Sequence, residues 1–371
     1  MRRLANDCFG STRLPKGDRI ADAAVQALLR EAPGADAPSR GDLLAAVEAL
    51  GAAGDPACRA FVVTVSVHPR WVDADLLARG QRVALSLAIP TGIVLLLGGL
   101  TEVYGVTPIA RVLGKTKRLE SSTWRRMLET GRFIRDIHRP GGLAPGGEGA
   151  RAIARIRLIH AMVRARLEGS RDVVTQQQMA FTLYAHSHVV RTGLSSLGFG
   201  LDEDEAQAHQ HLWRVVGHMM GVDRRVLPSS PAAEAALYRR LYPAVVDGSC
   251  EESQRLVACS IETVRQRARL PRGLVHAIVH RLAGRPLAAR LGVPSGGRWA
   301  RVLAAGTRVA RIINRVRKIG PVRRAFAAMG GLFADRVVAG DPDHAAPVGA
   351  AAARGCARAL DFNSGATGPA T

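Results

Sequence analysis

Lysine and aromatic residues are scarce in this chain of 371 residues, although its net charge is strongly positive. Four of its 52 basic residues are lysines, and aromatic residues make up 4% of the chain. Surfaces that bind single-stranded nucleic acid place aromatic side chains among the basic ones, and no such mixture occurs here. A nucleic-acid partner is therefore not expected despite the net charge of +21. The arginine excess is typical of a coding bias toward G and C.

Paired cysteines and a secretion signal are also missing. The five cysteines are scattered, odd in number and without a CxxC pair, which argues against both a disulfide framework and a thiolate metal site. The opening MRRLANDCFG has no apolar run behind its arginines. We therefore expect a cytoplasmic protein.

Strand-like alternation is absent, and helical periodicity is present throughout. Hydrophobic residues make up 47% and charged residues 22%, as in globular proteins, and the richness in Ala, Leu and Arg favours helix. We predict an all-α fold with an N-terminal extension (1–40), a single helical domain (41–339) and a disordered Ala/Gly/Pro-rich tail (340–371). Helices are predicted over residues 22–29, 42–52, 56–67, 73–87, 121–137, 150–167, 175–191, about 203–220, 231–242, 251–269, 273–282 and 298–319.

One apolar segment has two interpretations. Residues 83–101 contain nineteen uncharged residues, just enough to span a bilayer. Pro90, Gly92, Gly98 and Gly99 interrupt the segment, as in the buried helices of a large soluble core. We favour buried core, and the membrane-embedded alternative stays open.

The predicted helix 150–167 carries a histidine on its apolar face. Residues spaced three and four apart form this face: Ile153, Ile156, His160, Val163 and Leu167. A buried imidazole needs a partner, which is either a backbone carbonyl of the core or a metal ion. Arg157 and Arg164, one turn to either side, have the reach to bind acidic groups of a ligand.

A second stripe occurs on the predicted helix 121–137. It consists of Arg126, Thr130, Phe133 and Ile137. A guanidinium and a hydroxyl on an otherwise apolar face indicate either a polar spot inside an apolar cavity or the solvated edge of an amphipathic helix.

Together these segments resemble the rubber oxygenase catalytic-domain family. The resemblance covers roughly residues 65–290 and rests on the order of WVDADLLARGQRVAL, WRRMLETGRFI, PGGLAPGG, ARIRLIHAMVRARL and HLWRVVGHMMGV. It implies a b-type haem and O₂ as co-substrate in a single globin-like helical domain with a buried haem pocket. It also implies His160 as the axial ligand of the iron, with Arg126 and Thr130 lining the pocket.

Two departures from the family pattern bear on the substrate. Rubber-cleaving members can carry a lysine before the threonine, where this chain has Glu129, and they use an upstream glutamate as a base. The corresponding stretch TPIARVLGKTKRL has no acid before Glu120. The resemblance thus implies O₂ attack on an apolar, isoprenoid or lipid-like substrate, with Glu129 as acid or base, more than it implies rubber itself.

Other interpretations remain open. The first is a haem sensor or carrier without turnover, and the second is a protein of this fold without haem that works at a membrane surface. A non-haem metal site is disfavoured. Five histidines lie close together in the sequence, but they lack the paired carboxylates of such a centre. They are His186, His188, His209, His211 and His218.

The stretch 298–324 is basic and amphipathic. Such a helix usually packs its apolar side on the core and leaves its arginines in solvent, and we expect that arrangement. The alternative is peripheral contact with an anionic membrane.

Overall fold

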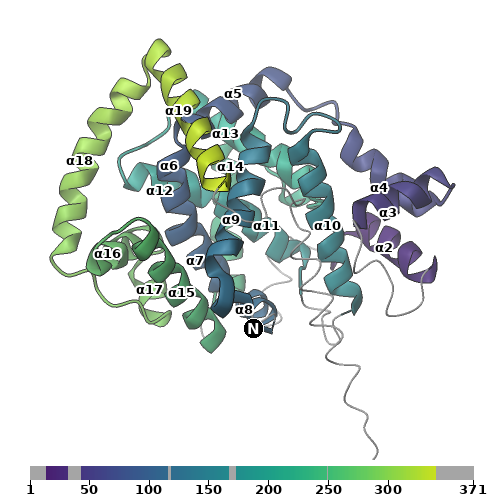
Figure 1. Ribbon diagram of the computed structural model, residues 1–371, viewed down its shortest axis with the longest axis horizontal. Coiled ribbons are helices and arrows are strands. Elements are labelled where there is room, and N and C mark those ends of the chain that lie inside the picture. The colour runs from purple at the N-terminus through teal and green to yellow at the C-terminus, as the bar shows by residue number, and fades with distance from the viewer. Residues whose placement is uncertain (1–13, 32–42, 116–117, 167–172, 249, 340–371) are drawn as a thin grey trace, which may run out of the picture.

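The computed structural model describes residues 14–31, 43–115, 118–166, 173–248 and 250–339 (Figure 1). Within these ranges the chain is helical and has no strand, which confirms the all-α prediction. The predicted disordered tail, 340–371, lies outside the described residues. The helices are α2 (Arg19–Glu31), α3 (Leu43–Ala52), α4 (Pro56–Ser66), α5 (Ala74–Ser86), α6 (Ala88–Val94), the π-helical η1 (Leu95–Gly99), α7 (Leu100–Tyr104), α8 (Thr107–Lys115), α9 (Arg118–His138), α10 (Glu148–Arg166), α11 (Gln176–His186), α12 (His188–Ser196), α13 (Glu203–Met219), the 3₁₀ helix η3 (Arg224–Val226), α14 (Pro231–Val245), α15 (Glu251–Arg267), α16 (Arg272–Leu282), α17 (Arg285–Arg290), α18 (Trp299–Arg317) and α19 (Gly320–Ala339).

Side-chain caps fix where the central helices begin. Thr175 and Gln178 form a capping box at the start of α11, and Asp202 and Glu205 form another at the start of α13. Each box satisfies backbone N–H groups that the first helical turn leaves without partners. The predicted starts near residues 175 and 203 are therefore confirmed.

The prediction of one helix over 175–191 is wrong. The helix is interrupted at Ser187, which follows α11 and precedes α12. The Ser187 hydroxyl donates to Glu234 at 3.2 Å and accepts from Arg191, which also pairs with Glu234. This buried polar network lies between segments distant in sequence, and it favours a break that local propensity does not indicate.

The apolar segment 83–101 folds into α6, η1 and neighbouring turns of helix. Val94, Leu95 and Leu97 are buried. No single described helix is long and apolar enough to cross a membrane; Ala74–Ser86 and Ala88–Tyr104 together have the length and composition, but they are bent by 80° at the break.

Asp18 and helix α2 pack against the helices that follow them. Helix α2 packs against α10 and α4, and its alanines join the core that α10 contributes to. Asp18, just before α2, lies against Arg157 of α10 with both side chains almost fully buried. Part of the predicted N-terminal extension, Asp18 and α2, thus packs on helices of the predicted domain.

The last two helices form a hairpin at one end of the molecule (Figure 1). Helix α19 returns over α5, α6 and α9, whereas α18 contacts α16 and α19. The expectation that α18 buries its apolar side is wrong. Its buried residues are Thr307, Ala310, Asn314 and Arg317, and its valines and isoleucines are exposed.

Candidate active site

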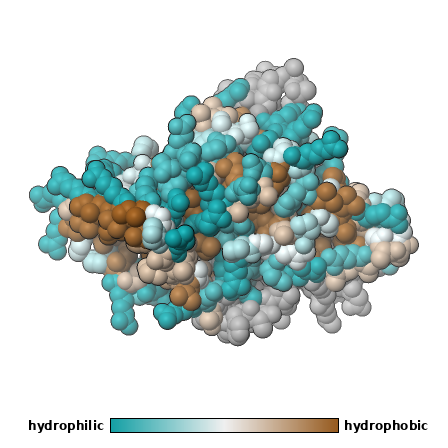
Figure 2. Space-filling view, turned by 90° about the horizontal axis from the view of Figure 1, so that it is seen from above, coloured by the Kyte–Doolittle hydropathy of each residue, from teal (hydrophilic) through white to brown (hydrophobic). Residues whose placement is uncertain are grey.

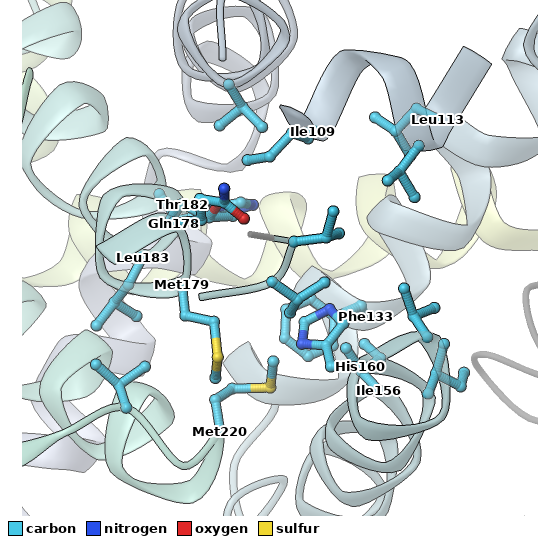
Figure 3. Close-up of a pocket in the computed structure, with 18 of the residues that line it drawn as sticks. Ile109, Leu113, Phe133, Ile156, His160, Gln178, Met179, Thr182, Leu183 and Met220 are labelled. Carbon is cyan, nitrogen blue, oxygen red and sulfur yellow. Dashed lines mark hydrogen bonds between the residues drawn. The ribbon is translucent and has the colours of Figure 1, made fainter. Parts of the chain in front are cut away.

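A largely apolar cavity of about 380 Å³ lies among α8, α9, α10, α11 and α13 (Figure 3). Its volume is within the range of small-molecule and cofactor sites. Ile109, Phe133, Ile156, Met179 and Met220 form much of its wall. Few polar groups reach it, so each of those that do has a large effect on what the cavity can bind.

His160 lines this cavity from the middle of α10. Its neighbours on the same face, Ile156 and Val163, line the cavity too, so the predicted stripe faces the cavity over this turn. The Nδ1 atom is buried and has no hydrogen-bond partner among the described residues. Burial, with the nearby Arg164 charge, lowers the pKa of His160 to about 4. The imidazole is therefore neutral at pH 7, the form that ligates metals.

Helix α9 places a cation and an acid on the same wall. Arg126, Glu129 and Phe133 line the cavity. The Nη1 atom of Arg126 is buried without a hydrogen-bond partner among the described residues. Thr130 does not line the cavity; its hydroxyl donates to the Arg126 carbonyl oxygen at 3.1 Å, one turn back along the helix. Ile137, the last residue of the predicted stripe, is fully buried in the core.

Arg157 and Arg164 lie outside the cavity lining. Arg157 pairs with Asp18 and donates to the Thr64 hydroxyl at 2.9 Å, and Arg164 pairs with Asp22 at 2.7 Å. Both guanidinium groups thus bind carboxylates of the N-terminal segment. Their predicted role toward acidic groups of a ligand has no support in this arrangement.

A second cavity histidine, His186, was not among the predicted site residues. It ends α11, and its Nδ1 lies 2.8 Å from the Thr182 carbonyl oxygen. A carbonyl only accepts, so Nδ1 carries the proton and Nε2 keeps the lone pair. Burial lowers its pKa. The sequence did contain a signal for it: His186 follows Thr182 by four positions and Met179 by seven, which places the three on one face of a helix.

A buried acid lies on α7. Glu102 precedes the cavity-lining Val103 in the sequence but does not line the cavity, and it accepts a 2.7 Å hydrogen bond from the Tyr238 hydroxyl. Burial raises the pKa of Glu102 to about 7. Glu120, the first acid after the stretch that lacks the family's base, has a side chain outside the described part of the chain.

The histidines of the disfavoured metal site bind different partners. His188 packs on the Tyr238 ring at 4.5 Å, and His211 Nε2 accepts from the backbone N–H of Asp73 at 3.2 Å. His218 lies against Trp71, with 5.7 Å between the ring centroids. Across the described ranges, no group of three or more His, Cys, Asp or Glu side chains is arranged to hold a metal ion.

Comparison with known proteins shows the family. Residues 81–312 match the family model described as "ER-bound oxygenase mpaB/B'/Rubber oxygenase, catalytic domain". The chain therefore belongs to this family of oxygenases. The matched range contains Arg126, Glu129, His160 and His186.

Two known proteins are similar to the chain. A rubber oxygenase of Streptomyces sp. (strain K30) is 23% identical over 182 residues, which are 46% of this chain and 44% of that protein. The matched region thus spans less than half of the relative's length. The structure of latex clearing protein in the closed state superimposes with a TM-score of 0.65 at 18% identity, covering 87% of this chain and 90% of that one. This second likeness shows a shared fold.

Proposed function

We propose that this protein is a haem b-dependent oxygenase that uses O₂ to attack a C=C bond of an apolar, isoprenoid or lipid-like substrate. The observation that carries the proposal is His160, a neutral imidazole on the wall of a buried apolar cavity within the oxygenase-family match. The substrate class is suggested by the rubber oxygenase relative and by the cavity's apolar wall.

The residues present fit a haem. His160 would supply the nitrogen ligand, and its cavity-lining neighbours Ile156 and Val163 suit the apolar macrocycle. Arg126 has a buried Nη1 with a hydrogen bond to give, which suits an acidic group of the cofactor. When bound, the haem supplies an iron centre that activates O₂.

The chain's own side chains then act on the substrate. The apolar wall excludes water and holds a hydrocarbon chain by burial of its surface. Glu129 adds a carboxylate on the α9 wall beside Arg126, in a position to take a proton from the substrate or return one. This assigns to Glu129 the acid–base work for which the stretch TPIARVLGKTKRL offers no glutamate.

The decisive experiment is the visible spectrum of the purified protein and of three variants. The wild type should show a Soret band and release haem into acidified organic solvent. His160→Ala should lose the band, because it removes the proposed bond to iron. His186→Ala tests the other cavity histidine, and His218→Ala tests one outside the cavity; both should stay coloured.

Two results would overturn the assignment. A wild type that stays colourless after haem supplementation during expression has no haem site of this kind. A bleached His186→Ala variant beside an intact His160→Ala spectrum moves the ligand to α11. Oxygen consumption with an unsaturated isoprenoid, and formation of carbonyl products, separates an oxygenase from a haem carrier.

A further inference from the structure

Helix α18 has its polar face toward the body of the protein. Both carboxylate oxygens of Glu205 accept hydrogen bonds from Arg317 at 2.9 Å, and both side chains are almost completely buried. Asn314 donates to the Gly200 carbonyl oxygen at 2.8 Å. These contacts fix the rotation of the helix about its axis, because rolling it to bury other residues would leave Glu205 charged and unpaired.

Apolar residues run along one exposed side of α18. Val309 is 57% exposed and Ile312 is 61% exposed, values usual for charged residues. Five such residues, spaced by seven, three, one and three positions, share one side of the helix, and we call them the α18 stripe: Val302, Val309, Ile312, Ile313 and Val316. Figure 2 shows an apolar patch at the left-hand end of the molecule, where Figure 1 places α18.

A row of arginines runs beside this stripe. Arg301, Arg308, Arg311 and Arg315 are exposed, and their spacing of seven, three and four puts them together on the helix. Within the described ranges, none of them has a carboxylate oxygen within ion-pair distance. The helix therefore presents three sides: polar residues toward the body, an apolar stripe, and unneutralised arginines.

We propose that α18 docks the protein on an anionic lipid surface. An anionic lipid surface satisfies both outer sides of the helix at once, because it is apolar inside and carries phosphates at its edge. Isoleucine and valine enter the boundary between headgroups and acyl chains, and arginines at the same depth meet the lipid phosphates. The proposal concerns the outer face of the molecule and does not depend on the function assigned to the cavity.

Vesicle co-sedimentation of the full-length protein tests this. The protein should pellet with vesicles that contain about 30% phosphatidylglycerol in phosphatidylcholine and remain free with phosphatidylcholine alone. Binding should weaken between about 0.1 M and about 1 M salt, where the screening length falls from about 10 Å to about 3 Å. Binding that ignores both lipid charge and salt would overturn the proposal, and so would no binding at all.

Two sets of substitutions locate the surface. Arg308→Gln/Arg311→Gln/Arg315→Gln should lower the partition coefficient on anionic vesicles by on the order of 100-fold, since each arginine contributes about fivefold. Ile312→Ser/Ile313→Ser/Val316→Ser should lower it by at least about tenfold, because buried apolar area also drives binding. Because these residues are exposed, helical content and Tm should not change.

A charge-matched control tests whether binding depends only on the net charge of the protein. Arg59→Gln/Arg70→Gln/Arg82→Gln removes the same charge from exposed positions on α4, the following loop and α5. An equal loss of binding in this control would attribute the effect to net charge and overturn the proposal.

Sedimentation velocity tests whether the α18 stripe binds a second copy of the chain. A wild type that dimerises, beside a monomeric serine variant, would assign the α18 stripe to a second copy of the chain instead.

Discussion

Replacing Arg317 by methionine removes the guanidinium while keeping much of its length in a fully buried place. The change leaves Glu205 buried, with the backbone N–H of Asp202 at 3.4 Å and the Lys318 ammonium at 3.9 Å as its remaining partners. Breaking a buried pair from one side usually costs about 3–5 kcal/mol. Since two weaker partners remain, we expect a cost near the lower end, about 3 kcal/mol.

Urea unfolding followed by circular dichroism measures this cost. Lys318→Met serves as the control, because Lys318 is 34% exposed and its loss should cost less than about 1 kcal/mol. Glu205→Gln should cost about as much as Arg317→Met, because it leaves the arginine charge buried. In the double variant the two losses should not add, because both break the same interaction. A cost for Arg317→Met below about 1 kcal/mol would refute the argument that this pair fixes α18.

The remaining predictions concern the cavity and its surroundings. Arg126→Ala should lower haem occupancy or turnover with helical content unchanged; unchanged haem content and turnover would mark Arg126 as a surface arginine, whose loss costs less than about 0.5 kcal/mol. Burial raises the pKa of Glu102 to about 7, so its contribution to stability is complete below pH 4.5 and is lost as the pH rises through 7. Glu102→Gln should therefore be more stable than the parent by up to about 3 kcal/mol near pH 8, and denaturant titrations that show no gain would refute this. Burial lowers the pKa of His138 to about 3, so its contribution is complete above pH 6.5 and is lost as the pH falls. In the same assay, the free energy of unfolding of His138→Leu should fall by about 2 kcal/mol less than that of the parent between about pH 7.5 and about pH 5. An equal fall in both proteins would contradict the burial of a neutral imidazole.

The helices and part of the site were predictable because they depend on local pattern. The apolar periodicity of 150–167 predicted the face of α10 that carries His160. On α9, the residues Arg126 and Phe133 of the predicted stripe line the cavity, whereas Thr130 does not. The α9 residues that line the cavity are Arg125, Arg126, Glu129 and Phe133. Thr130 lies about 40° beyond Arg126 around the helix axis, just outside this side.

The rest depended on partners that are distant in sequence. Arg157 pairs with a residue 139 positions earlier, and Arg317 with one 112 positions earlier. Nothing near either arginine in the sequence indicates those carboxylates. Periodicity marks the apolar side of α18 correctly. This apolar side is not buried, however, because the buried Arg317–Glu205 ion pair determines which side of the helix faces inward.

The pairing of Asp18 with Arg157 has a practical consequence for anyone who shortens this chain. The sequence invites removal of the first forty residues, since they are mixed in composition and contain prolines and glycines. Such a deletion would remove α2, which packs against α10. It would also leave the guanidinium of Arg157, three residues before His160, without the Asp18 carboxylate. A shortened protein that expresses poorly or lacks colour would therefore report on the missing helix. It would not be evidence against a cofactor.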